Sequence, residues 1–339
     1  MTIGLTSRDN PPFIVRFANI PTRVRAVEHL FSTAAMPDPI MSRRLDLRAV
    51  LGTLFCCLLW GGNSVAVKYA ISDDGLPALG CATLRFLLCL PILAFVCVKI
   101  GGGVKLRKQD AWLYLLHGLI TAVQIGSYNW GTSQSEAGRS SVFINVHPLV
   151  VAPMAWLLLG EHLGTRGVVG LAAAALGVAV ILSKSLLAGG GLTGDLVVLA
   201  SGVVFGLQTV AQKMTMPRVP PTTLLLMQTV VAIPLSLAAS LVLERGHAWH
   251  FTPEATWGLL YQGLAVSGVC FSLWLILLGR YPASRLATIA FLTPLFGLTL
   301  SNLTRGDALT PTLVAGGALV GFGVYLVASG QGAADQAAP

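Results

Sequence analysis

At 339 residues the chain is long enough for two soluble domains, but its composition excludes them: charged residues are only 11% of the sequence, against roughly 25% in ordinary soluble proteins. Hydrophobic residues are 54%, and so few charges cannot cover the surface of a soluble fold, so we predict an all-α membrane protein. The net charge of +8 therefore bears on orientation in the bilayer and not on nucleic acid, because no basic cluster alternates with aromatic residues on a polar domain.

Residues 1–46 differ in character from the rest of the chain. They contain no uninterrupted apolar core of about 7–15 residues, which a signal peptide requires. Prolines interrupt them at Pro11, Pro12, Pro21, Pro37 and Pro39. We predict a disordered cytoplasmic tail, unless translation really begins at Met41, just before Ser42-Arg43-Arg44.

Ten apolar segments follow, each near the roughly 20 residues that cross the core of a bilayer. In chain order we predict spans at 49–71, 77–99, 111–133, 139–159, 166–184, 194–214, 222–243, 255–278, 285–304 and 310–329. The longest interruptions, 100–110 and 244–254, are too short for a domain outside the membrane. The function is therefore expected to lie within the membrane.

Lysines and arginines beside the predicted spans indicate the orientation, because they collect on the cytoplasmic side. With the N-terminus inside, the inner side holds Arg43, Arg44, Arg48, Lys99, Lys105, Arg107, Lys108, Arg166, Lys213, Arg218, Arg280 and Arg285. The outer side holds only Lys68, Arg139, Lys184, Arg245 and Arg305. We therefore predict a multi-pass protein of the cell (inner) membrane with both termini in the cytoplasm.

The two halves of the chain repeat each other. Residues 60–68 and 205–213 share Gly, Val, Ala and Lys at the same spacing, and both carry an amide followed by a hydroxyl, in Asn63-Ser64 and Gln208-Thr209. Further matches pair Ala137, Arg139, Pro148, Gly170 and Gly177 with Ala283, Arg285, Pro294, Gly316 and Gly323. So many spaced matches are unlikely to arise by chance.

Each half contains five predicted spans, and an odd number turns the second half upside down relative to the first. We therefore predict ten transmembrane helices as two inverted five-helix repeats, at 47–185 and 192–330, followed by a short cytoplasmic tail at 331–339. Inverted repeats of this kind are typical of secondary transporters, with the substrate site between the halves near the middle of the membrane.

Several motifs resemble the drug/metabolite transporter superfamily, specifically proteins with two EamA domains. They are Leu59-Trp60-Gly61-Gly62-Asn63 through Lys68, Ala82-Thr83-Leu84-Arg85-Phe86, Leu159-Gly160-Glu161, Tyr281-Pro282-Ala283-Ser284-Arg285 and Pro294. The resemblance covers about residues 48–330; the family's Leu-Gly-Glu at the end of the ninth span is here Arg305-Gly306-Asp307. It implies transport of a small polar metabolite, an amino acid or a related compound, with export favoured. It also implies that the fifth and tenth helices pack together, away from the pathway.

Polar side chains within the predicted spans are candidates for the substrate pathway, since they are costly in a bilayer unless they face a cavity or a partner helix. In the third span His117, Thr121, Gln124 and Tyr128 fall on one helical face. They indicate either a cavity lining or interhelical hydrogen bonds. In the fourth span Asn145 and His147 precede a proline, which frees a carbonyl one turn back.

Arg85 is the most deeply placed permanent charge, and no carboxylate lies in the middle of any predicted span. Because a guanidinium keeps its proton, Arg85 must snorkel, pair or bond to carbonyls, or meet an anionic group of the substrate. We expect Lys68 and Lys213, near opposite membrane faces, to snorkel.

The full set of predicted pathway residues is Trp60, Asn63, Ser64, Arg85, His117, Thr121, Gln124, Tyr128, Asn145, His147, Gln208, Thr209, Gln228 and Trp274. Helix kinks are predicted at Pro91, Pro148, Pro234 and Pro294. The six cysteines all lie in apolar runs and form no metal-ligand or disulfide pattern. We therefore predict no catalytic residue, no metal and no cofactor.

The sequence thus predicts a secondary transporter that works by alternating access, whose partners are a small-molecule substrate and the lipid bilayer; a homodimer is left open. Because acids are missing from mid-membrane positions, a facilitator or exchanger is favoured, with proton coupling through His117 or His147 as the second choice. A non-transporting scaffold or sensor is the alternative. An intramembrane enzyme is less favoured, because no nucleophile–base pair or metal motif is present.

Overall fold

The structure, a computed structural model, describes residues 46–71, 75–159, 165–188, 191–281, 283–290 and 292–337. All secondary structure in these ranges is helical, as predicted. The N-terminal tail and the alternative start at Met41 lie outside the described residues, of which Asp46 is the first. Glu161 and Pro282 of the family-like motifs lie outside them as well.

The helices begin and end close to the predicted spans. The first half contains α3 (Leu47–Ala70), α4 (Ala78–Lys99), η1 (Lys108–Asp110), α5 (Ala111–Ser133), α6 (Ala137–Ile144), α7 (His147–Leu159) and α8 (Thr165–Ala188). The second half contains α9 (Leu192–Thr215), α10 (Pro221–Leu243), α11 (Pro253–Leu260), η2 (Tyr261–Cys270), α12 (Phe271–Leu278), α13 (Ala283–Ala290), α14 (Thr293–Arg305) and α15 (Pro311–Ala337). α15 therefore continues past the predicted end of the last span at 329.

Within the described ranges, five helices are long and apolar enough to cross a membrane: α3, α4, α9, α10 and the continuous run Pro253–Leu278. α8 and α15 contain shorter apolar stretches, Thr165–Ile181 and Pro311–Gly323. α5 is as long as its neighbours, but its polar stripe lowers its mean hydropathy. The chain is thus a multi-pass helical membrane protein, and the count of ten spans stays a prediction.

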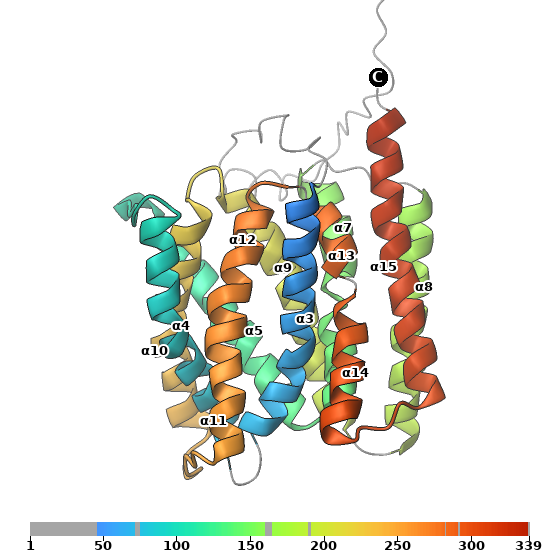
Figure 1. The fold of residues 1–339 in the computed structure, drawn as a ribbon, viewed down its shortest axis with the longest axis horizontal. Helices are drawn as coiled ribbons and strands as arrows, with labels where there is room; N and C mark the ends of the chain where they lie inside the picture. The colour runs from blue at the N-terminus through green and yellow to red at the C-terminus, as the bar shows by residue number, and fades with distance from the viewer. Residues whose placement is uncertain are drawn as a thin grey trace, which may run out of the picture. The chain divides into compact units, whose positions relative to one another are not determined.

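The helices of the two halves make equivalent contacts. α3 packs against α14 and against the run Pro253–Leu278, whereas its counterpart α9 packs against α7 and α5. Two further close pairs join equivalent helices, α4 with α10 on one flank and α8 with α15 on the other (Figure 1). Exchanging the halves therefore maps the contacts of α3 onto those of α9, and it maps the pairs α4–α10 and α8–α15 onto themselves.

Repeated glycines allow the closest of these contacts. A Cβ on Gly206 would lie 2.6 Å from the Cβ of Val150 in α7, and a Cβ on Gly61 would lie 2.6 Å from the Cβ of Phe296 in α14. Only glycine leaves room for such an approach. The glycine that both halves share at this position therefore lets the first helix of each half cross a broken helix tightly.

Two helices are interrupted near the predicted kinks. Residues 145–146 separate α6 from α7 just before His147-Pro148, and α14 begins at Thr293-Pro294 after the end of α13 at Ala290. Pro148 cannot donate to the carbonyl four residues earlier, at Ile144, which is where α6 ends. In contrast, α4 and α10 run through Pro91 and Pro234 as single helices.

Lys68 and Lys213 bind the carboxyl ends of helices. Lys68 Nζ donates to the carbonyl of Ser133, the last residue of α5, at 3.0 Å. Lys213 Nζ donates to the carbonyl of Leu278, the last residue of α12, and to that of Tyr281 at 3.0 Å. The expectation of snorkelling is wrong for Lys213, which is only 2% exposed, because the free carbonyls of a helix end solvate its charge inside the protein.

Candidate functional site

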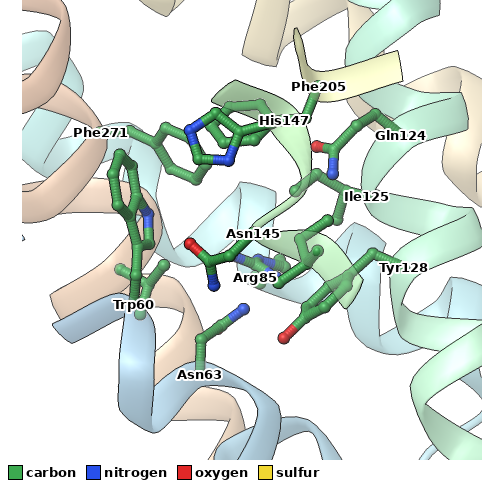
Figure 2. A pocket seen from close by; sticks show the side chains of 12 residues that line it. Trp60, Asn63, Arg85, Gln124, Ile125, Tyr128, Asn145, His147, Phe205 and Phe271 are labelled. Carbon is green, nitrogen blue, oxygen red and sulfur yellow. The ribbon is translucent and has the colours of Figure 1, made fainter. Parts of the chain in front are cut away.

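A cavity of about 450 Å³ of empty space lies where the first four helices of the first half meet α9 and the run Pro253–Leu278 of the second half (Figure 2). Its lining comes from α3, α4, α5, the α6–α7 break, α9, η2 and α12: Trp60, Asn63, Arg85, Gln124, Ile125, Tyr128, Ile144, Asn145, His147, Phe205, Val266 and Phe271.

Aromatic rings gather on one side of this cavity. Trp60 meets Phe205 and Phe271 edge to face, with ring centroids 6.0 and 5.8 Å apart. His147 lies 4.6 Å from Phe205 by the same measure. Figure 2 shows these four rings together, with the side chains of Asn63 and Arg85 away from them. The cavity therefore has an aromatic side and a polar side.

Arg85 is the only permanently charged cation in the described lining of the cavity. It is 0% exposed, and its Nε donates to Ser267 Oγ at 2.9 Å while Nη1 donates to Gln262 Oε1 at 3.4 Å. Both partners lie on η2, five residues apart, where the helix is π-helical. Residues five apart are one turn apart in a π-helix but about 140° apart in an α-helix, so the π-helical stretch lets both side chains face Arg85.

The polar stripe of α5 bonds to α3 and α9. Tyr128 Oη lies 2.7 Å from Ser64 Oγ, and Thr121 accepts a hydrogen bond of 2.8 Å from Gln208. Gln124 Nε2 donates to Ser201 Oγ at 3.1 Å. These contacts are interhelical, yet Tyr128 and Gln124 also line the cavity. The two roles foreseen for the stripe therefore occur together.

A second hollow of about 380 Å³ adjoins the first and shares four lining residues with it. Those shared residues are Gln124, Ile125, Phe205 and Phe271. The second hollow adds a group of amides and hydroxyls, Thr121, Gln208, Gln212, Gln228, Thr229 and Ser267. Gln212 donates to Gln228 at 3.1 Å, which ties α9 to α10.

The structure brings most of the predicted pathway residues together. The first cavity collects Trp60, Asn63, Arg85, Gln124, Tyr128, Asn145 and His147, and the second adds Thr121, Gln208 and Gln228. Four of the predicted residues line neither cavity: Ser64, His117, Thr209 and Trp274. His117 bonds to Thr215 at 2.9 Å and Thr209 to its own helix at Phe205, while Trp274 packs behind Trp60 at 5.0 Å.

The sequence prediction missed the apolar wall and the partners of Arg85. Phe205 occupies the position of Trp60 in the second repeat, so the alignment of the halves could have identified it. Gln262 and Ser267 could not be identified in this way, because their side chains both face Arg85 only where the helix is π-helical. In the described part of the chain no three His, Cys, Asp or Glu side chains gather into a metal site.

Ion pairs hold the two ends of the α5–α9 pair. Arg139 Nη1 lies 3.2 Å from the buried Asp195, near the end of α5 and the start of α9. Arg218, which follows α9, lies 2.6 Å from Asp110, which precedes α5. The carboxylates in these pairs lie at the ends of helices, away from the cavity.

Comparisons with known proteins agree with this architecture. A protein of Salmonella typhimurium named "Probable amino-acid metabolite efflux pump" is 26% identical over 306 residues, which are 84% of this chain and 95% of that protein. A protein of Bacillus subtilis named "Uncharacterized transporter YoaV" is 23% identical over 284 residues, 83% of this chain and 96% of that protein. A crystal structure with 20% sequence identity matches 82% of this chain and 96% of its own with a TM-score of 0.64, which shows a shared fold.

The described helices thus enclose a cavity between two sequence repeats, an arrangement that is typical of secondary transporters. The profile of the EamA-like transporter family matches residues 47–183 and again residues 192–329. The chain belongs to this family, a member of the drug/metabolite transporter superfamily.

Proposed function

We propose that the chain is a secondary transporter that exports a small polar metabolite, an amino acid or a related compound, across the cell membrane by alternating access. The observation that carries the proposal is the cavity that helices of both halves enclose beside the α6–α7 break. Broken helices at the interface of two repeats are typical of substrate sites in secondary transporters. The efflux pump named above supports the substrate class and the direction.

The proposed architecture is ten spans in two inverted repeats, with both termini in the cytoplasm of a cell whose inner membrane holds the protein. The equivalent contacts of α3 with α14 and of α9 with α7 support two repeats that rock against each other. In this proposal the pair Arg139–Asp195 closes the outer end and the pair Arg218–Asp110 the inner end. Alternating access requires that these two ends open in turn.

Export is proposed to proceed by facilitated diffusion or exchange. The acids Asp110, Asp195 and Glu244 support this, since they are engaged at helix ends, Glu244 with the backbone N–H groups of Leu79 and Gly80 at 2.8 and 3.1 Å. Proton coupling through His117 or His147 is the second candidate. His147 lines the cavity, which favours it over His117.

Counterflow in liposomes tests the proposed function. The purified full-length chain is reconstituted, loaded with one unlabelled amino acid at a time, and the uptake of the same labelled amino acid is followed. We expect uptake above that of protein-free liposomes for at least one amino acid. Trp60→Ala should reduce the rate by about two- to thirteenfold, since an aromatic contact contributes about 0.5–1.5 kcal/mol.

Trp257→Ala is the matched control, because Trp257 is 72% exposed and lies away from the cavity on α11. It should transport at the wild-type rate. Folded protein that moves no solute, or an equal loss in both tryptophan variants, would contradict the proposed function.

A further inference from the structure

We infer that the cavity recognises an amino acid with an apolar side chain as a zwitterion. The carboxylate binds the guanidinium of Arg85, the ammonium group binds the side-chain amide of Asn63, and the apolar side chain packs on the rings of Trp60, Phe205 and Phe271. This inference rests on the proposed function and adds the chemistry of the solute and its orientation.

Arg85 is the proposed partner of the carboxylate, because its charge is buried beside the cavity without a counter-charge among the described residues. Ser267 and Gln262 bond to Nε and Nη1 and are neutral, while Nη2 has no hydrogen-bond partner among the described residues. The ion pairs found there do not involve Arg85. A guanidinium cannot lose its proton to escape burial, and a buried charge is stabilised by an opposite charge. A solute carboxylate supplies that charge and accepts hydrogen bonds from the N–H groups of Nη2.

A carboxylate fits this position better than a phosphate group. Arg85 is one permanent cation, and Lys68 and Lys213 are engaged elsewhere, at the ends of α5 and α12. A phosphate ester carries about −1.5 to −2 charges near neutral pH, which would leave an excess negative charge in the cavity. One carboxylate balances one guanidinium.

Asn63 is the proposed partner of the ammonium group. It lies on α3 and is 7% exposed, and its Oδ1 has no hydrogen-bond partner in the part of the chain that the structure describes. A buried amide oxygen without a partner costs free energy that a bound donor recovers. The ammonium group of an α-amino acid provides such a donor, so the two ends of a zwitterion find different partners in the cavity.

The aromatic side of the cavity is the proposed partner of the apolar side chain. Trp60, Phe205 and Phe271 meet edge to face at 5.8–6.3 Å between ring centroids, and they lie away from Arg85 (Figure 2). Such a surface stabilises an aromatic or other apolar side chain through burial and ring contacts. The polar and aromatic sides together orient the solute.

Calorimetric titration of the purified full-length chain with four probes tests the inference. L-Phenylalanine has all three groups, L-phenylalaninamide lacks the carboxylate, 3-phenylpropionate lacks the ammonium group, and L-serine lacks the ring. We expect L-phenylalanine to bind and the amide to bind about ten- to a hundredfold more weakly, as for the loss of a hydrogen bond between charged groups. 3-Phenylpropionate and L-serine should each bind at least about tenfold more weakly.

Arg85→Gln should remove the preference for the acid over the amide, and Arg85→Lys should retain part of it, because lysine keeps the charge but loses the two-pronged geometry. Thr83→Val is the matched control. Thr83 is buried on the same helix and bonds to Ser236 on α10 at 3.1 Å, but it does not line the cavity. The control should keep the full preference.

The affinities of the wild-type protein for L-phenylalanine and L-phenylalaninamide test the inference even if a variant does not fold. Equal affinity for the two ligands would overturn it, and so would an equal loss for both in Arg85→Gln. If L-phenylalanine does not bind while counterflow shows transport of another metabolite, the inference fails and the proposed function stands. If no solute is moved at all, the proposed function fails.

Discussion

Lysine 213 illustrates how a charge is kept inside this membrane protein. It is 2% exposed, and its ammonium group donates to the carbonyls of Leu278 and Tyr281, where α12 ends. Those carbonyls have no helical partner because the helix stops there. The lysine and the helix end therefore solvate each other, and neither needs water.

This contact predicts a stability effect at Lys213. Lys213→Ala should lower the free energy of unfolding by about 1–3 kcal/mol, because buried carbonyl oxygens lose their donor. Lys68→Ala is the comparison, since Lys68 is only partly buried and donates to the carbonyl of Ser133. Thermal unfolding in detergent should show the larger fall in melting temperature for Lys213→Ala. An equal or smaller fall than for Lys68→Ala would contradict this account.

At the same scale, the stripe on α5 shows what residue spacing predicts well. His117, Thr121, Gln124 and Tyr128 were predicted to share one face, and all four are buried against other helices. Spacing alone could not say which of them also reach the cavity. That depends on where α9 crosses α5, and His117 lies beside Thr215 at the far end of α9.

At the scale of elements, α8 and α15 form a contact that serves the scaffold and not the cavity. A Cβ on Gly177 of α8 would lie 2.6 Å from the carbonyl oxygen of Gly316 in α15. Small residues at such positions let helix backbones approach closely in a membrane. Neither helix contributes a residue to the lining of the two cavities.

A substitution at this contact is expected to change the stability of the protein and not its affinity for the solute. Gly177→Ala should force α8 and α15 apart and lower the melting temperature, while the folded fraction keeps its affinity for the transported solute. Gly317→Ala is the matched control, because among the described residues a Cβ there would meet only Leu298, at 3.5 Å. Its melting temperature should stay near that of the wild type. A loss of affinity in folded Gly177→Ala, at unchanged melting temperature, would show that α8 acts on the site.

Helix ranges were the part of the fold that the sequence predicted best, because apolar runs and the prolines that interrupt them are both local signals. The break before Pro148 is one example, since α6 ends where the proline removes a hydrogen bond. The partners of Arg85 could not be predicted in the same way. They depend on the π-helical stretch η2, which brings Gln262 and Ser267 to one face, and no spacing in the sequence marks it.

At the scale of the whole molecule, the two halves use equivalent residues for equivalent tasks. Lys68 binds the end of α5 and Lys213 binds the end of α12, while Gly61 and Gly206 each let a broken helix approach. Arg85 has no charged counterpart, since the aligned prolines Pro91 and Pro234 place Gln228 at its position in the second half. The scaffold is therefore symmetric and the cavity is not, which allows one solute to be held in one orientation.

The most direct test of the central claim is protection of the cavity by the transported solute. Val266→Cys introduces a thiol in the lining on η2, at a position without a proposed contact to the solute, and the native cysteines are all buried. Lys105→Cys, at an exposed position between α4 and α5, is the control. A small thiol reagent should label Val266→Cys more slowly as the solute is added, with half protection at the concentration that half-saturates transport, while labelling of Lys105→Cys stays constant. Unchanged labelling of Val266→Cys at a solute concentration that saturates transport would contradict the assignment of this cavity as the substrate site.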